Sequence, residues 1–151
     1  MGKTSQKKVI RKSKRIAIVV SKFNEFITSR LLEGCLDELK KQKVPQKDFM
    51  VVEVPGAFEI PVMALKLAKK KDIQAVICLG AVIRGETLHF ELVAYGCAQG
   101  IMEVALATGK PIVFGVLTTE TVDQAEKRSK SKGDNKGRDA AITALEMMDL
   151  L

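Results

Sequence analysis

The chain contains few cysteines, and their arrangement argues against two kinds of site. Three are present among 151 residues, at Cys35, Cys78 and Cys97. No C-x-x-C pair occurs and the number is odd, so neither a zinc centre nor a disulfide framework is indicated. All three lie in apolar segments, which predicts buried, reduced thiols in a cytoplasmic protein.

Long hydrophobic runs are also lacking. No apolar run approaches the roughly 20 residues that span a membrane. The first such run, residues 16–20, is too short for a secretory signal. The sequence shows no internal repeat and no linker between domains. A length of 151 residues predicts a single domain over residues 15–151, large enough to bury about 68–70% of its unfolded surface.

Acidic residues are absent from the first fifteen positions, which hold seven bases. The whole chain has 25 Lys and Arg against 18 Asp and Glu, so the remainder has 25 − 7 = 18 bases against 18 acids. The body of the protein is therefore neutral, and the positive charge belongs to a basic tail, predicted to be flexible, at residues 1–14. Such a tail is either a solvated arm or a binder of RNA or of an anionic surface. We expect no other contact with nucleic acid.

Four short β-type runs alternate with helical segments, at residues 15–20, 49–54, 75–79 (extending to about 83) and 112–117. All except the second are almost uninterrupted apolar sequences, which is typical of parallel strands buried on both faces. Helices are predicted over about residues 25–42, 61–70, 88–108, 122–129 and 136–151, with Asn24 capping the first. The alternation predicts a three-layer α/β fold: a doubly wound (flavodoxin-like), four-stranded parallel sheet flanked by helices.

The helix predicted over residues 88–108 is apolar on all sides. Between Phe90 and Ala107 its only charged residues are Glu91 and Glu103. Such a helix must be covered on more than one side, and one sheet covers only one. We therefore expect a second copy of the chain to cover the other side. The alternative is burial between layers of a single chain.

The turns that follow the strands carry residues able to bind a ligand. Open parallel sheets bind ligands beyond the carboxyl ends of their strands. Imidazole is the usual general acid/base near neutral pH, and backbone N–H groups at a helix start can hold a phosphate. Two aromatics, a carboxylate, a Gly/Thr turn and the single histidine gather there: Phe23, Phe58, Glu59, Gly85, Thr87 and His89. This mixture suits a planar polar ligand together with an anion.

Each of these residues also has a purely structural interpretation. Phe23 and Phe58 would pack into the core beside a helix start, and Glu59 would stabilise a helix N-terminus. His89 would be a solvent-facing residue of a helix start. A P-loop is absent and no G-x-G-x-x-G follows the first strand, which argues against a dinucleotide fold.

Five segments occur together in a recognisable order. They are residues 23–28 (FNEFIT), 54–61 (VPGAFEIP), 80–90 (GAVIRGETLHF), 114–120 (FGVLTTE) and 135–137 (NKG). Over residues 15–151 the chain closely resembles the 6,7-dimethyl-8-ribityllumazine synthase family of riboflavin biosynthesis, and the five linked segments are far more specific than any one of them.

The resemblance implies an activity and an assembly. The expected reaction condenses 5-amino-6-ribitylamino-uracil with 3,4-dihydroxy-2-butanone 4-phosphate and releases water and inorganic phosphate, the penultimate step of riboflavin biosynthesis. It implies no metal and no organic cofactor. The expected assembly is a homo-oligomer with its sites between subunits, either a pentamer or a shell of about 60 subunits. Riboflavin synthase is the further partner that the resemblance implies.

The family's site residues carry over by matching position. His89 would transfer protons during the reaction, and Lys136 would have a supporting role near Phe114. The phosphate would be held by four residues: Gly85, Glu86, Thr87 and Arg128. The pyrimidine and ribityl groups would contact seven: Phe23, Ala57, Phe58, Glu59, Val82, Ile83 and Phe114, the last from the adjacent chain.

Three positions depart from the family's pattern. Glu86 stands where a small residue is common, and a carboxylate beside a phosphate is tolerated only if it points away. The sequence SKSKGD at residues 129–134 replaces a small, Gly-rich stretch, which bears on subunit contacts and assembly size. Leu92 replaces an aromatic residue, and we interpret this as a packing change.

Two other classes of function fit parts of the sequence. One is a flavin or lumazine binder without catalytic activity, which would need neither His89 nor Arg128. The other is a cage-forming structural protein or RNA-associated assembly that uses the basic tail, for which RNA retention should depend on residues 1–14.

Overall fold

The computed structural model describes residues 15–151, so the basic tail predicted at residues 1–14 lies outside the described residues. Its sheet consists of β1 (Arg15–Ser21), β2 (Phe49–Val54), β3 (Ile73–Ile83) and β4 (Ile112–Thr119). The strands are all parallel, in the order β2-β1-β3-β4. This arrangement confirms the predicted flavodoxin-like α/β fold.

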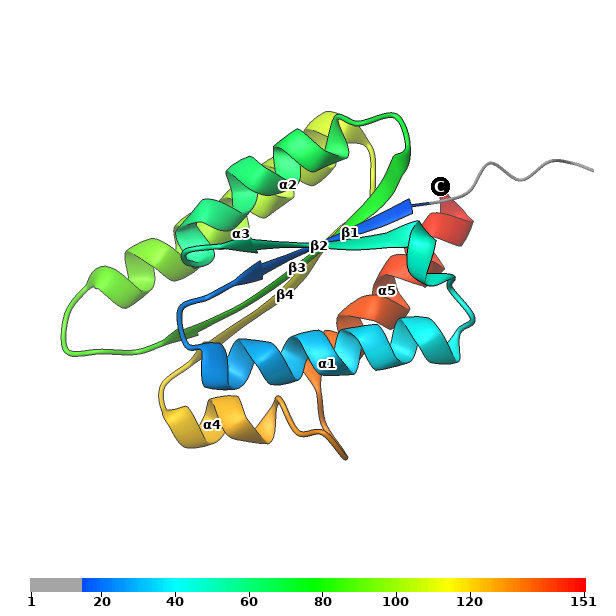
Figure 1. Cartoon of the computed structure of the whole chain (residues 1–151). Coiled ribbons are helices and arrows are strands. Elements are labelled where there is room, and N and C mark those ends of the chain that lie inside the picture. Colours follow the sequence, from blue (N-terminus) through cyan, green and yellow to red (C-terminus); the bar gives the residue numbers. More distant parts are fainter. Residues whose placement is uncertain (1–14) are drawn as a thin grey trace, which may run out of the picture.

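Helices cover both faces of the sheet, in three layers (Figure 1). One face carries α1 (Glu25–Lys41) and α5 (Lys136–Leu150), with the short α4 (Val122–Lys127) beside α1. The other face carries α2 (Ile60–Ala68) and α3 (His89–Thr108). Two 3₁₀ turns, η1 (Gln46–Asp48) and η2 (Ala57–Glu59), precede β2 and α2. Each face of the sheet has its own hydrophobic core.

Position in the sheet explains the composition of the strands. Central β1 and β3 are buried along nearly their whole length, as their apolar runs predict. Strand β2 lies at an edge, and its Met50 and Val51 are exposed, in keeping with its mixed sequence. Strand β4 forms the other edge and exposes Phe114.

The predicted capping role of Asn24 is wrong in its chemistry. Helix α1 does begin at Glu25, but the Asn24 side chain makes no capping hydrogen bond. Its backbone is left-handed, with φ 59°, and its Nδ2 donates to the carbonyl oxygen of Ala81 at 2.9 Å. The side chain therefore ties the start of α1 to β3 instead of completing the first turn of the helix.

Helix α5 packs against α1 at very short range. A Cβ atom added at Gly137 would lie 1.8 Å from the backbone oxygen of Leu31. The buried Asn135 side chain lies against Gly34, donates to the carbonyl oxygens of Arg30 and Lys130 at 3.1 Å each, and accepts from the N–H of Arg138 at 3.0 Å. This contact anchors the segment between α4 and α5. The helix predicted over residues 122–129 ends earlier, at Lys127, and Ser129 instead pairs with Asn135 in an antiparallel bridge.

Helix α3 leaves a long apolar face uncovered in the single chain. Tyr95 and Leu106 are 74% and 77% exposed, and Leu88, Leu92 and Met102 are also exposed. Among the described residues this is the one helix long and apolar enough to cross a membrane, judged by length and composition alone. The sequence contains no uninterrupted apolar run long enough to span a membrane. The mean hydropathy of α3 is nevertheless as high as that of a membrane-spanning helix, despite Glu91 and Glu103.

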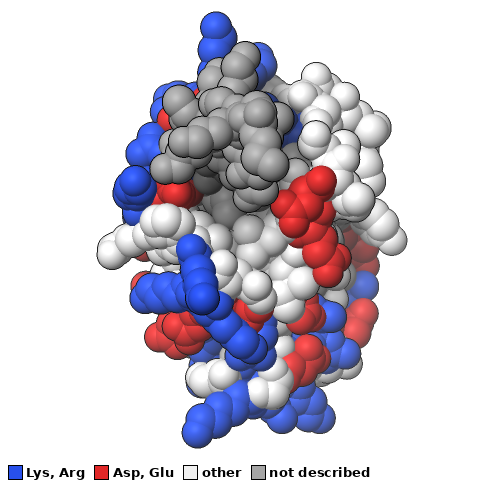
Figure 2. Space-filling view, turned by 90° about the vertical axis from the view of Figure 1, so that its right-hand side faces the viewer, with Lys and Arg blue, Asp and Glu red and all other residues white. Residues whose placement is uncertain are grey.

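Charge of both signs is spread over the described surface. Figure 2 shows the side of the molecule where the strands begin, with Lys and Arg interspersed among Asp and Glu. Ion pairs such as Arg15–Asp72, at 2.9 Å, form on this side. Mixed charge there agrees with the balance of bases and acids counted after residue 15.

Candidate active site

The turns after β1 and β2 are joined at the carboxyl edge of the sheet. The backbone N–H groups of Lys22 and Phe23 donate to the carbonyl oxygens of Val54 and Pro55 at 2.8 and 3.0 Å. With the Asn24–Ala81 bond, these contacts bring the ends of β1, β2 and β3 together. The site therefore rests on cross-linked turns at the edge where ligands of parallel sheets bind.

A cavity of about 670 Å³ opens at this edge. Its walls include nine of the residues predicted from the sequence: Phe23, Ala57, Phe58, Glu59, Val82, Ile83, Gly85, Thr87 and His89. They come from five parts of the sheet edge: the β1–α1 turn, η2, the end of β3, the β3–α3 turn and the start of α3. A cavity of this size is typical of small-molecule sites.

Of the three predicted aromatic residues, the two that line this cavity face solvent in the single chain. Phe23 is 71% exposed and Phe58 is 62% exposed, so the interpretation that they pack into the core is wrong. Phe58 lies against α3 at Gly96, where an added Cβ would come within 3.0 Å of its ring. Both rings therefore offer free faces to a planar ligand at the cavity wall.

His89 is the first residue of α3 and faces the same cavity. Its backbone N–H donates to Thr87 Oγ1 at 3.4 Å, within the turn that holds Gly85. Glu86, between the two lining residues, does not line the cavity. The histidine thus lies next to a turn and helix start of the kind that binds anions.

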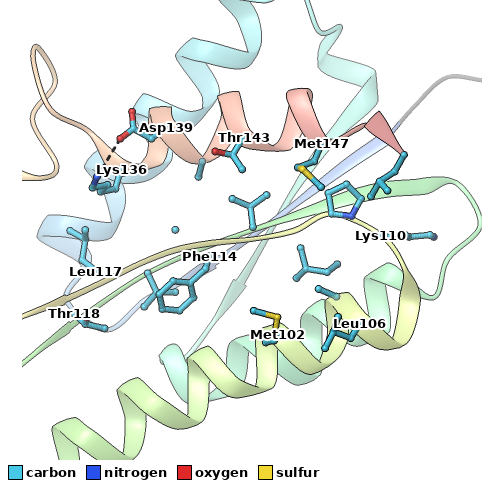
Figure 3. Close-up of a pocket in the computed structure, with 18 of the residues that line it drawn as sticks. Met102, Leu106, Lys110, Phe114, Leu117, Thr118, Lys136, Asp139, Thr143 and Met147 are labelled. Carbon is cyan, nitrogen blue, oxygen red and sulfur yellow. Dashed lines mark ion pairs between the residues drawn. The ribbon is translucent and has the colours of Figure 1, made fainter. Parts of the chain in front are cut away.

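The other three predicted residues lie elsewhere in the chain. Phe114, Arg128 and Lys136 line a second cavity of about 830 Å³ over β4, between α3 and α5. Figure 3 shows the Phe114 ring there, with Met102 and Leu106 on the α3 side and Lys136 paired with Asp139 at 3.6 Å. Arg128 Nη1 donates to the carbonyl oxygen of Gln124 at 2.9 Å. A single chain therefore does not bring Arg128 to His89.

Several residues of the first cavity were not predicted from the sequence. Phe90 and Leu92 line it, from the first turn of α3. Phe90 adjoins the histidine in the 80–90 segment, and Leu92 stands at one of the three departures noted above. Their closeness to His89 in the sequence, one and three positions away, was the signal that could have identified both. Among residues 15–151, no group of three or more His, Cys, Asp or Glu residues is placed to hold a metal ion.

The chain as a whole is similar to proteins of one known family. The model for 6,7-dimethyl-8-ribityllumazine synthase matches residues 13–151. The protein of that name from Syntrophus aciditrophicus (strain SB) is 52% identical over 151 residues, covering 100% of this chain and 98% of its own length. The chain belongs to the 6,7-dimethyl-8-ribityllumazine synthase family. In this lumazine synthase family member, the matched region contains every predicted site residue and begins inside the basic tail.

Proposed function

We propose that this chain condenses 5-amino-6-ribitylamino-uracil with 3,4-dihydroxy-2-butanone 4-phosphate to form 6,7-dimethyl-8-ribityllumazine, the penultimate step of riboflavin biosynthesis. Family membership and the 52% identical relative support this activity. The single observation that carries it is the cavity in which Phe23 and Phe58 adjoin His89 and the turn of Gly85 and Thr87. It offers aromatic faces, an acid/base and an anion site within one concave surface.

The reaction needs positioning and proton transfer. The ring amine adds to the ketone carbon and water leaves, giving an imine. A proton then leaves the neighbouring carbon while the C–O bond to phosphate breaks, and the phosphate takes the bonding electrons. The resulting enol gains a proton on carbon and becomes a ketone. The ribitylamino nitrogen adds to this carbonyl, and loss of a second water closes the ring. Holding both substrates together supplies much of the acceleration.

His89 is the group proposed to move these protons. It lies beside Thr87 and Gly85, where backbone N–H groups and the positive end of α3 favour a bound phosphate. A base next to the phosphate can take the proton from carbon as the phosphate leaves. The two aromatic rings would hold the pyrimidine against this position. Glu59 and the floor residues Val82 and Ile83 would contact its ribityl side.

The second half of the site would come from a neighbouring subunit. Arg128, Phe114 and Lys136 line a cavity of their own, and the apolar face of α3 beside it is uncovered. A second chain placed against this face would bury that surface and bring Arg128 and Phe114 to a neighbour's His89. We propose a pentamer or a larger shell as this assembly, a cytoplasmic location, and riboflavin synthase as a further partner.

Mixing the two purified substrates with the protein tests the activity. We expect lumazine absorbance to rise together with the release of inorganic phosphate. His89→Ala should lower kcat by about 10²-fold or less, in line with acid/base contributions of this kind. An unchanged kcat would exclude proton transfer by His89, and binding of lumazine without turnover by the wild type would identify a binding protein instead of an enzyme.

Arg128→Ala tests the proposed phosphate contact. Loss of a charge-assisted hydrogen bond should raise KM for the phosphate substrate by about tenfold or more and leave KM for the pyrimidine nearly unchanged. Lys130→Ala is the matched control, because Lys130 is an exposed base of the same loop that does not line the cavity. Equal effects of the two variants would contradict a specific role for Arg128.

A further inference from the structure

Arg84 connects three parts of the structure immediately behind the proposed active site. It follows the last residue of β3, and its backbone N–H donates to the carbonyl oxygen of Thr119 in β4 at 2.9 Å. Its Nε lies 2.6 Å from Glu120 Oε2, and its Nη1 pairs with Glu91 Oε1 in the first turn of α3. One guanidinium therefore joins the end of β4 to the beginning of the helix that carries His89.

The same guanidinium also supports the wall of the cavity. Its Cζ atom lies 4.4 Å from the centre of the Phe90 ring, and that ring lines the cavity whereas Arg84 does not. A cation over an aromatic face is attracted to the ring electrostatically, and more strongly when solvent is excluded. Arg84 thus contacts residues on the C-terminal side of His89, at the next two positions along the chain.

The ion pair with Glu91 is the stronger of the two anchors. Glu120 is well exposed, and exposed pairs contribute little. The Glu91 side chain is 31% exposed, and its second carboxylate oxygen is buried without a partner among the described residues. Hydrogen bonding from Arg84 lowers the pKa of Glu91 and keeps this carboxylate ionised. Removing the arginine would leave that charge uncompensated at the start of α3.

No side chain of the described residues forms a hydrogen bond to the His89 imidazole. The hydrogen bond that His89 makes to a side chain comes from its backbone, whose N–H donates to Thr87 Oγ1. The position of the ring therefore depends on where the backbone of the first turn of α3 is held, and Arg84 holds that turn at Phe90 and Glu91. A displacement of about 1 Å at a catalytic group can lower a rate by about 10²-fold.

We propose that Arg84 is a positioning residue, which fixes the start of α3 and thereby the His89 imidazole and the adjoining Gly85–Thr87 anion turn. It acts through Glu91 and Phe90 and does not touch the substrates. The proposal rests on the proposed function, because it assigns Arg84 a role in that same reaction.

Arg84→Met is the test, with Arg15→Met as the matched control. Arg15 forms a comparable ion pair with Asp72 at the opposite end of the sheet. We expect Arg84→Met to lower kcat by about 10–100-fold while KM for the pyrimidine changes by less than about threefold. Arg84→Met should remain folded at the assay temperature, and its assembly size should match that of the control. A kcat within about twofold of the wild type would overturn the proposal.

A triple variant separates positioning from simple charge repulsion. Arg84→Met/Glu91→Gln/Glu120→Gln removes both carboxylate charges together with the arginine. We expect kcat to stay low, because the connection between β4 and α3 is still missing. A return to the wild-type kcat would show that unpaired carboxylates, not a displaced helix start, caused the loss.

A third measurement does not depend on activity. Amide hydrogen exchange in peptides covering residues 84–94 should be faster in Arg84→Met than in the wild type and unchanged in Arg15→Met. Equal exchange in all three proteins would overturn the proposal even if the wild type produced no lumazine. A wild type without turnover would by itself contradict only the proposed function.

Discussion

At the scale of single residues, burial controls the chemistry of the three thiols. All three cysteines are free and buried, as their apolar sequence context predicts. Desolvation raises the pKa of Cys35 to about 12 and that of Cys97 to about 11, and burial raises the pKa of Cys78 as well. Thiols are therefore expected at neutral pH, and thiolates are the reactive form.

The reactivity of these thiols can be measured directly. At pH 8 a disulfide reagent should label the folded protein at least about 100-fold more slowly than the protein in urea, because each unit by which the pKa rises lowers the thiolate fraction about tenfold. The colour released by the reagent gives both rates. Rapid labelling of the folded protein would show that a cysteine is exposed or ionised.

At the scale of elements, Lys110 holds the end of α2 to the beginning of β4. Its ammonium group donates to the carbonyl oxygens of Ala68, Lys70 and Ile73 at 2.7, 2.8 and 2.7 Å. The first carbonyl belongs to the last turn of α2, where a helix leaves acceptors unpaired, the second to the connection that follows, and the third to the first residue of β3. A cation at this end also interacts favourably with the helix dipole.

Lys110→Met should therefore destabilise the protein. The change keeps the length of the side chain but removes three hydrogen bonds, so we expect a loss of about 1–3 kcal/mol in the free energy of unfolding. Denaturant unfolding measures this loss. Lys66→Met is the control, because Lys66 is an exposed lysine of α2. This variant should change the free energy of unfolding by less than about 0.5 kcal/mol. Similar losses in both variants would contradict a capping role.

Gly137 tests the contact between α1 and α5. An alanine Cβ at this position would meet the backbone of Leu31, which a side-chain rotation cannot relieve. We expect Gly137→Ala to lower the free energy of unfolding by about 1–3 kcal/mol or more. A Cβ at Gly85 would meet no atom within 4 Å, so Gly85→Ala should leave the unfolding midpoint unchanged. Wild-type stability of Gly137→Ala would show that the two helices can separate at no cost.

At the scale of the whole molecule, two cavities divide the predicted site residues between them. His89 and Arg128 line different cavities. An assembly that covers α3 with a neighbour would join them, and it would also bury apolar surface that a lone chain exposes to water.

Mixed assemblies can show whether the site is shared. If His89 and Arg128 act from different subunits, equal amounts of His89→Ala and Arg128→Ala chains that are unfolded and refolded together should regain about a quarter of the wild-type sites. Steady-state turnover at low phosphate substrate would report this gain. Activity equal to the mean of the two separate variants would place both residues in the same subunit's site.

Local sequence patterns were sufficient to predict the strands and helices and the residues of the cavity that contains His89. Apolar runs predicted β1, β3 and β4, because strands buried in a sheet have few polar residues. The turns after those strands also held the predicted cavity residues, from Phe23 to His89. Asn24 shows where this reasoning stops: a residue typical of helix caps bonds instead to Ala81, far along the chain.

The amino-acid sequence by itself determined the succession of strands and helices along the chain, the family, and the position of the single histidine at a helix start. Burial and turn chemistry leave local, periodic signals in the sequence. Only the tertiary structure decided that Phe114, Arg128 and Lys136 lie apart from His89, and that Arg84 joins Glu91 to Glu120. Such contacts depend on how distant segments pack in three dimensions, and sequence periodicity carries no record of which distant side chains meet.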